Sequence, residues 1–215
     1  MKYTLLRCLP WLFAGLLAAC ASGPGSVVPP GPPTLPAAVA AALPADIVLL
    51  GEQHDAQEHP KLHLQTVQAL AARQQLAAVV LEMAEQGVST ADLPANIDEA
   101  AVRAMLRWDE AAWPWEQYGP VVMAAVRAGV PVLGGNLPRK QVAQAMRAEA
   151  LDNRLPAPAL ARQREAIRDG HCSLLPEAQV GPMARVQIAR DRAMAWTLTQ
   201  AAQEMPAGRV VLLMA

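Results

Sequence analysis

Aromatic residues are scarce in this sequence. They make up 4% of its 215 residues, as five Trp, two Tyr and one Phe, so few large rings are available to anchor a core or a ligand. Cysteine is also rare, and three cysteines cannot form the disulfide framework of a small secreted domain. The formal net charge of -1 provides no basic field, which argues against a protein that tracks nucleic-acid phosphates.

Apolar residues, by contrast, are plentiful. They account for 53% of the chain, and the length suits one domain, so we expect a packed core rather than disorder. Several short apolar runs are nearly continuous, which indicates strands buried on both faces of a sheet. These runs occupy 47–50, 77–81, 130–133 and 210–213.

Helical patterns separate the apolar runs, at about 60–75, 97–107, 115–128, 138–151, 157–169 and 181–204. Alternation of strand and helix predicts an α/β fold, with a mainly parallel sheet and flanking helices. The long insertions at 83–129 and 137–208 hold several helices each. We therefore expect a helical cap or subdomain beside the sheet.

The first residues have the features of a secretion signal. Lys2 and Arg7 precede the apolar run 9–19, which is too short to be a permanent membrane span. The run ends in LAAC, which resembles a bacterial lipobox with Cys20 as the lipidated first residue of the mature protein. The sequence thus predicts a lipoprotein signal peptide over 1–19.

The residues after Cys20 indicate where the protein resides. Ala21 lacks the negative charge that usually retains lipoproteins in the inner membrane, which favours the outer membrane, facing the periplasm. Proline and glycine fill over half of 21–36, and such backbone favours an extended tether. We expect a lipidated tether over 20–44 and a folded domain over 45–215.

Polar residues follow the first three predicted strands. Glu52 and His54 follow the first strand, Glu82 the second, and Asn136 and Arg139 the third. Because ligands of parallel sheets bind beyond the carboxyl ends of the strands, these positions form a candidate site. Asn136 could alternatively cap the following helix.

His54 is the most informative residue of that group. Either Glu52 or Asp55 could fix its tautomer and make it a better base or metal ligand. The alternative is that both carboxylates only cap a helix or satisfy loop amides. His59 and His63 lie one helical turn apart, so with His54 they could chelate zinc, although such spacing is common by chance.

The large rings of the mature chain concentrate in one segment. Trp108, Trp113, Trp115 and Tyr118 fall within eleven residues, where they could anchor the cap or line a site for a flat ligand. With the signal removed, Tyr118 is the only tyrosine and so the only possible phenolate ligand of a haem iron. Farther along the chain, His171 and Cys172 are adjacent in the sequence. We expect both to be buried structural residues.

In combination these segments are similar to a known family. VLLGEQHD, LEM, WDEAAWPWEQYGPVV, VLGGNLPRK, HCSLLPEA and QIARDRAMAWTL together resemble the ChaN family of haem-binding, iron-regulated bacterial lipoproteins. That family lies in a superfamily with erythromycin-esterase-like and Tiki protease-like proteins. The resemblance covers residues 45–215. It implies an α/β domain, haem bound in a surface pocket or between two copies, and a role in iron acquisition together with a transporter.

The resemblance also implies roles for individual residues. Tyr118 matches the family's W-x-x-Y element and is the candidate axial ligand, and Arg139 is the candidate partner of the haem propionates. The cofactor site it implies comprises Glu52, His54, Trp115, Tyr118, Asn136 and Arg139.

Two other functions stay open at this stage. Glu52, His54 and Glu82 could serve an esterase-like or metalloprotease-like hydrolase, with zinc or another divalent metal. Alternatively, the fold could serve only as a structural or partner-binding module. The family's second Gly-His element, after the last strand, is missing here, so we also expect the domain to be truncated at its C-terminus.

Overall fold

The structure, a computed structural model, describes residues 33–215. The predicted signal peptide, Cys20 and the first part of the predicted tether lie outside these residues. Their proposed roles in export and lipid attachment therefore stay predictions.

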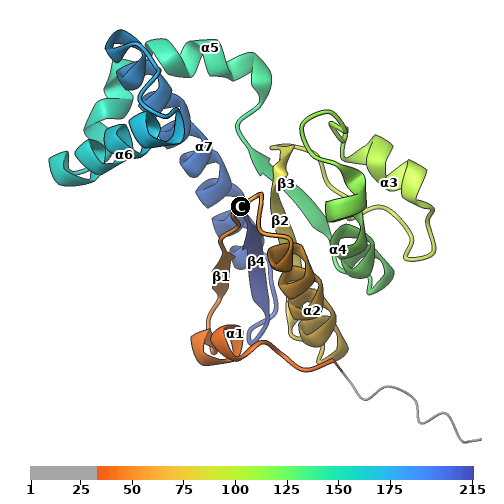
Figure 1. Cartoon of the computed structure of the whole chain (residues 1–215). Coiled ribbons are helices and arrows are strands. Elements are labelled where there is room, and N and C mark those ends of the chain that lie inside the picture. The colour runs from red at the N-terminus through yellow and green to blue at the C-terminus, as the bar shows by residue number, and fades with distance from the viewer. Residues whose placement is uncertain (1–32) are drawn as a thin grey trace, which may run out of the picture. The chain divides into compact units, whose positions relative to one another are not determined.

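A four-stranded sheet forms the centre of the described domain (Figure 1). Its strands are β1 (Ile47–Leu50), β2 (Leu76–Glu85), β3 (Val132–Asn136) and β4 (Val210–Met214). They lie in the order β1-β4-β2-β3, and every neighbouring pair is parallel. The predicted α/β fold with a parallel sheet is confirmed.

Both faces of the central strands are buried, as the apolar runs predicted. In β2, Val79 and Leu81 join a cluster on one face, whereas Ala78 and Val80 join a second cluster on the other. Successive side chains of a strand point to opposite faces, so only a continuous apolar run can fill both clusters. The edge strand β1 is less covered, and Leu49 is 66% exposed.

Helices cover the two faces unequally. The bounds are α1 (Ala37–Ala42), α2 (Glu58–Ala72), α3 (Glu99–Met105), α4 (Trp115–Arg127), α5 (Arg139–Arg147), the 3-10 helix η1 (Glu149–Arg154), α6 (Ala157–Gly170) and α7 (Glu177–Gln203). Helices α2 and α4 pack on the first face, and the C-terminal half of α7 packs on the second. Val39 of α1 also joins the first core, so the folded domain begins before residue 45.

Helices α5 and α6, η1 and the start of α7 form the predicted helical subdomain, whereas α3 joins the first core through Val102. In Figure 1, α5, α6 and the start of α7 lie past the carboxyl ends of the strands. Asp152 holds this group together, because its carboxylate accepts hydrogen bonds from Arg185 at 2.9–3.2 Å and lies 3.7 Å from Arg164. Helix α4, from the first long insertion, packs on the sheet rather than in this group.

Two strands end later than predicted, which changes the setting of two candidate residues. Glu82 was expected after its strand, but β2 continues to Glu85 with a register shift against β3. Asn136 is the last residue of β3 rather than a loop residue. The apolar-run criterion stopped at the Glu82 carboxylate, although the strand resumes with buried Met83 and Ala84.

Within residues 33–215, no helix combines the length and the apolar character needed to cross a membrane.

Candidate functional site

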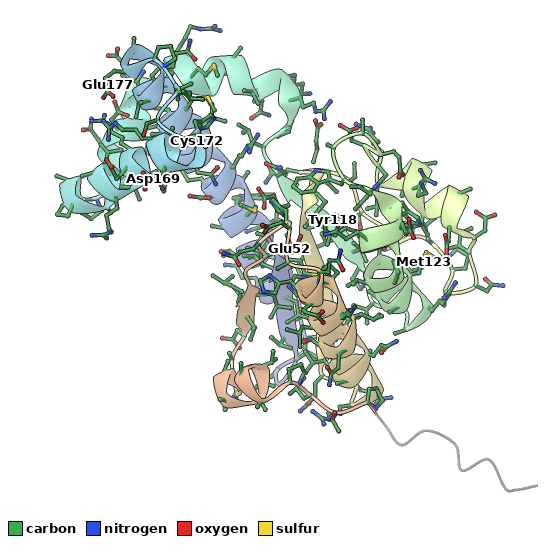
Figure 2. All side chains as sticks on the ribbon, in the orientation of Figure 1. Glu52, Tyr118, Met123, Asp169, Cys172 and Glu177 are labelled. Carbon is green, nitrogen blue, oxygen red and sulfur yellow. The ribbon has the colours of Figure 1, made fainter. Side chains whose placement is uncertain are left out.

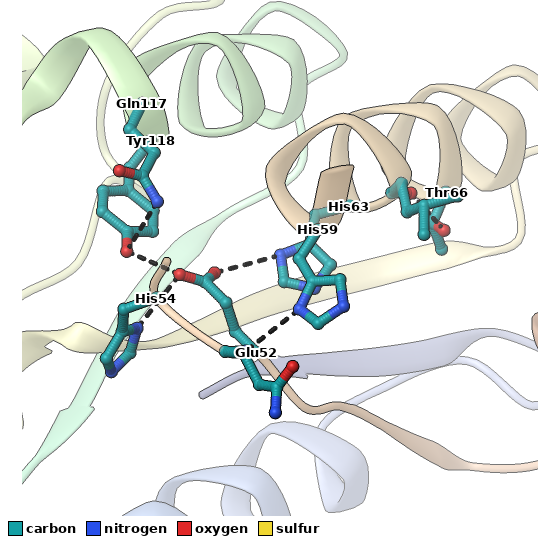
Figure 3. Close-up of polar contacts among 9 residues, drawn as sticks. Glu52, His54, His59, His63, Thr66, Gln117 and Tyr118 are labelled. Carbon is teal, nitrogen blue, oxygen red and sulfur yellow. Dashed lines mark hydrogen bonds and ion pairs between the residues drawn. The ribbon is translucent and has the colours of Figure 1, made fainter. Parts of the chain in front are cut away.

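A buried carboxylate lies at the carboxyl end of β1. The backbone N–H of Glu52 donates to the carbonyl of Ala215 at 2.7 Å, which fixes the residue just beyond the sheet. Its side chain is 0% exposed. Figure 2 shows Glu52 near Tyr118 of α4, and Figure 3 shows the polar contacts around them.

Glu52 is the centre of a hydrogen-bond network. Its Oε1 accepts the Tyr118 hydroxyl at 2.6 Å and lies 3.1 Å from His54 Nδ1. Its Oε2 faces His63 Nδ1 at 3.6 Å without forming a hydrogen bond. Of the two carboxylates considered for orienting His54, Glu52 has this role and the exposed Asp55 does not.

The expectation that Tyr118 ligates an iron stays a prediction, and in the structure its side chain faces inward. The residue is 2% exposed, and its hydroxyl donates to Glu52. Burial, followed by the hydrogen bond and the negative charge of Glu52, raises the pKa of Tyr118 far above its ordinary value. In this arrangement the phenol keeps its proton, and ligation of an iron would require it to become an accessible phenolate.

The three histidines near Glu52 do not form a zinc site. His59 Nδ1 accepts a hydrogen bond from the Gln53 backbone N–H at 3.0 Å, and His63 is 4% exposed. Burial lowers the pKa of His63, partly offset by the nearby Glu52 charge. Residues 33–215 contain no group of three or more His, Cys, Asp or Glu side chains placed to hold a metal ion. The zinc alternative is not supported, and the hydrolase reading is not favoured.

A cavity of about 570 Å³ opens beside this network, at the ends of β2 and β3. Its size lies within the range typical of small-molecule and cofactor sites. It combines two indole rings, three guanidinium groups and the strand-end residues. The lining residues that matter below are Glu82, Arg107, Trp108, Asp109, Trp113, Asn136, Arg139 and Arg190.

Trp113, rather than Trp115, is the ring that the structure places at the cavity. Trp115 is 7% exposed within the first core, and its Nε1 donates to Glu99 at 3.2 Å. The expectation that Trp115 faces a ligand is wrong, because Trp115 starts α4 on its buried side. Trp113 precedes the helix. The centroid of its ring lies 5.0 Å from that of His54 and 5.7 Å from that of Tyr118.

The cavity's arginines differ in their acidic partners. Arg139 forms an ion pair with Asp109 and is 74% exposed. Among the residues that the structure describes, neither Arg107 nor Arg190 forms an ion pair. Free guanidinium groups beside aromatic rings suit a flat ligand that carries carboxylates.

Asn136 does not cap the next helix. Its Nδ2 donates to the Glu82 carbonyl at 2.8 Å, and its Oδ1 is buried without a partner in the described part of the chain. The start of α5 is capped instead by Glu85, whose Oε1 accepts the Arg139 N–H at 3.0 Å. The sequence offered no sign of Glu85, since this residue was read as part of an insertion rather than a strand end.

Ionisation of Glu82 opposes folding. Burial raises its pKa, opposed by His54 and Arg190 and reinforced by the Asp191 and Glu52 charges. A carboxyl whose pKa is raised by folding binds its proton more tightly in the folded chain. The folded state therefore loses stability as the pH rises above about 4.3, the pKa of a glutamate carboxyl in the unfolded chain.

Glu82→Gln is consequently expected to raise the free energy of unfolding at pH 7. The gain should fade below about pH 4, where Glu82 is protonated in both states. Urea unfolding at the two pH values measures the difference. Asp55→Asn, at an exposed loop carboxylate, is the control and should have little effect. A gain from Glu82→Gln that is equal at both pH values would contradict this explanation.

His171 and Cys172 were expected to be buried, and this is wrong. Both are exposed in the turn after α6, in the helical group where Figure 2 labels Cys172. The backbone of Cys172 and Ser173 is left-handed, with φ of 52° and 57°, in the turn between α6 and α7. Only their position between two helices was readable from the sequence.

Comparisons with known proteins agree with this fold. Residues 38–215 match the family described as "Haem-binding uptake, Tiki superfamily, ChaN". A search of curated proteins found no match.

A solved structure described as "Cofacial heme binding to ChaN of Campylobacter jejuni" is similar, with a TM-score of 0.65 and 21% identity. The similarity covers 82% of this chain and 72% of that one, and at this identity it bears on the fold alone. Because the family match spans most of the sequence, the chain belongs to the ChaN family of haem-binding uptake proteins in the Tiki superfamily.

Proposed function

We propose that this chain binds haem in the cavity beside Trp113 and takes part in haem or iron acquisition. The single observation that carries the proposal is the presence of Trp113 together with Arg107 and Arg190, neither in an ion pair within residues 33–215, in a cavity of about 570 Å³. Family membership supports the same ligand.

The residues present fit such a ligand. Bound haem would supply a broad apolar ring, an iron that takes an axial ligand, and two propionate carboxylates. Trp108 and Trp113 offer apolar ring surface, and Arg107 and Arg190 offer charged donors for carboxylates. Arg139 remains a third candidate for the propionates if it exchanges its partner Asp109.

The first test is a hemin titration of the full chain followed by Soret absorbance. We expect saturable binding, and a double variant Arg107→Ala, Arg190→Ala that binds about tenfold more weakly or worse. A charge-assisted hydrogen bond contributes about 1.5–3 kcal/mol, and about 1.4 kcal/mol corresponds to a tenfold change.

Arg162→Ala is the matched control, because Arg162 is an exposed arginine of α6 outside the cavity. If wild-type protein gives no saturable Soret change, haem binding is refuted. If the control weakens binding as much as the double variant, only general charge matters and the cavity is the wrong site.

We further propose that Cys20 carries lipid and anchors the protein at the outer membrane, facing the periplasm. The LAAC sequence that ends at Cys20 supports this. Cys20→Ser is expected to move the protein from the membrane fraction to the soluble fraction and to stop incorporation of labelled palmitate. An unchanged distribution and unchanged labelling would refute lipid anchoring.

Transfer of haem to a transporter, and pairing of two chains around haem, belong to the same proposal. Sedimentation of the full chain with and without hemin tests the pairing. An unchanged mass at saturation would exclude it.

Capture of haem-loaded protein by the membrane transporter of the same bacterium, but not of haem-free protein, is the result expected for transfer.

A further inference from the structure

We propose that Asp109 is a specificity-determining residue of the cavity beside Trp113. Its carboxylate occupies the guanidinium group of Arg139 until a carboxylate of the ligand replaces it. The inference rests on the proposed haem binding and deepens it, because it makes the charged propionates, and not only the flat ring, a condition for tight binding.

Asp109 and Arg139 line the same cavity from different parts of the fold. Asp109 belongs to the segment 106–114 between α3 and α4, and Arg139 is the first residue of α5 in the helical subdomain. Their side chains form an ion pair. Among residues 33–215, no other hydrogen bond or ion pair joins segment 106–114 to residues 137–192. This pair is therefore the one polar connection between the aromatic segment and the helical subdomain in the described part of the chain.

The local backbone holds Asp109 in place for this contact. Its Oδ1 accepts the N–H groups of Ala111 at 3.2 Å and Ala112 at 3.4 Å, and its carbonyl accepts the Trp113 N–H at 2.9 Å. Aspartate often stabilises a turn in this way. The other carboxylate oxygen, Oδ2, accepts the guanidinium of Arg139. Asp109 thus presents one oxygen to Arg139 from a fixed turn.

The side chain of Arg139 can change its partner while its backbone stays anchored. The Arg139 N–H donates to Glu85 Oε1 at 3.0 Å, at the end of β2. The Arg139 side chain is 74% exposed and that of Asp109 is 31% exposed. An exposed ion pair contributes little to stability, because water screens the attraction and ordering two side chains costs entropy. A ligand carboxylate can therefore displace the Asp109 carboxylate at small cost.

The neighbouring charges favour a ligand that brings a carboxylate. Arg107 lies two residues before Asp109, lines the same cavity and, like Arg190, forms no ion pair within the described residues. A carboxylate that pairs with Arg107 therefore enters close to the pair of Asp109 and Arg139. When Arg139 turns to that carboxylate, Asp109 is released to water and no covalent bond changes. A ligand without carboxylates cannot make this exchange.

The other two carboxylates that line the cavity do not have this role. Glu85 accepts the backbone N–H of Arg139, and Glu82 forms no ion pair within residues 33–215. Asp109 is thus the only carboxylate of the cavity lining, in the described part of the chain, whose partner is a guanidinium group of the same cavity.

The experiment titrates full-length variants with hemin and with hemin dimethyl ester, whose carboxylates are blocked, in one detergent buffer with Soret detection. Asp109→Asn is the main variant, because its amide oxygen can still accept the N–H groups of Ala111 and Ala112. We expect Asp109→Asn to bind hemin about two- to fivefold more tightly than wild type, which corresponds to the loss of one exposed ion pair. The ester should bind to both proteins equally.

Further variants separate the ion pair from the general effect of charge. Glu116→Gln removes an exposed carboxylate outside the cavity and should leave the hemin affinity nearly unchanged. In an Arg139→Gln background, Asp109→Asn should tighten binding no more than Glu116→Gln does, because no guanidinium remains to be released. Asp109→Ser, whose hydroxyl can also accept in the turn, is the second variant. Circular dichroism checks the folding of each protein.

The outcomes separate this inference from the proposed function. Absence of hemin binding by wild type refutes both. Hemin binding that Asp109→Asn leaves unchanged, or a gain that persists in the Arg139→Gln background, overturns the role of Asp109 and leaves haem binding intact. An equal gain with the dimethyl ester also overturns it, because the carboxylates would then not be the group that the pair selects.

Discussion

Gly134→Ala is expected to lower the free energy of unfolding by about 3 kcal/mol, at the upper end of the usual cost of overpacking. An added Cβ would overlap the backbone carbonyl of Glu85, whose carbon would lie 2.7 Å away, and would also press on Val88. A side chain can change rotamer to make room, but a strand backbone cannot. The two strands would have to separate at this point.

The expected damage reaches the site as well. Gly134 lies where the register between β2 and β3 shifts, between Leu81 and Glu85. That shift positions Glu82 and Asn136 at the cavity. Gly134→Ala should therefore weaken hemin binding together with stability.

Gly170→Ala is the matched control, because the same substitution there meets open space and His171, not a proline, follows it. Gly170 is the last residue of α6, where alanine is favoured over glycine, so stability should be unchanged or slightly higher. Urea unfolding followed by circular dichroism measures both variants. A Gly134→Ala protein as stable as wild type would contradict the close strand approach.

Tyr118→Phe is expected to lower the free energy of unfolding by about 1.5–3 kcal/mol at pH 7, the usual contribution of a hydrogen bond to a charged group. The variant keeps the ring in the core and removes only the hydroxyl that Glu52 accepts at 2.6 Å. In a Glu52→Gln background the bond is neutral. The same substitution should then cost only about 0.5–1.5 kcal/mol.

The pH dependence gives an independent check. Folding raises the pKa of Tyr118, so its contribution is complete below the unfolded value of about 10 and is lost as the pH rises above it. Between pH 9 and pH 11, wild type should therefore lose more stability than Tyr118→Phe. If Tyr118→Phe cost the same with and without the Glu52→Gln substitution, or if the pH curves ran parallel, a bond to a buried carboxylate would be ruled out.

The strands could be predicted because the apolar residues that bury a strand lie next to one another in the sequence. A strand buried on both faces needs a continuous apolar run, and 210–213 supplied one. The run 47–50 also formed a strand, but at the sheet edge, where Leu49 is 66% exposed. The same criterion failed at β2, because Glu82 interrupts the run although the strand continues through it. A charged side chain at the edge of a cavity looks, in sequence, like the end of a strand.

The site could be predicted only in part. Glu52 and His54 could be nominated because ligands of parallel sheets bind beyond the carboxyl ends of the strands. The partnership of Tyr118 with Glu52 could not be found, since these residues are 66 positions apart and meet only after α4 packs on the sheet. Arg190 comes from α7, and only the packing of that helix brings it to the cavity.

The aromatic segment illustrates the same limit. Its concentration of rings predicted either an anchor for the cap or a site for a flat ligand. Trp115 is 7% exposed within the core, whereas Trp113, two positions earlier, lines the cavity. The choice depends on where α4 begins, because Trp115 is its first residue and turns toward the core. The composition identified the segment. The position at which α4 begins determines which tryptophan lines the cavity.

The most direct test of haem binding at this edge of the sheet is iron anomalous diffraction from crystals of the hemin-loaded full chain. We expect one strong peak in the cavity, with the ring against Trp113 and the carboxylates toward Arg107 and Arg190. A peak at the helical group near His171, or no bound iron at saturating hemin, would contradict the account.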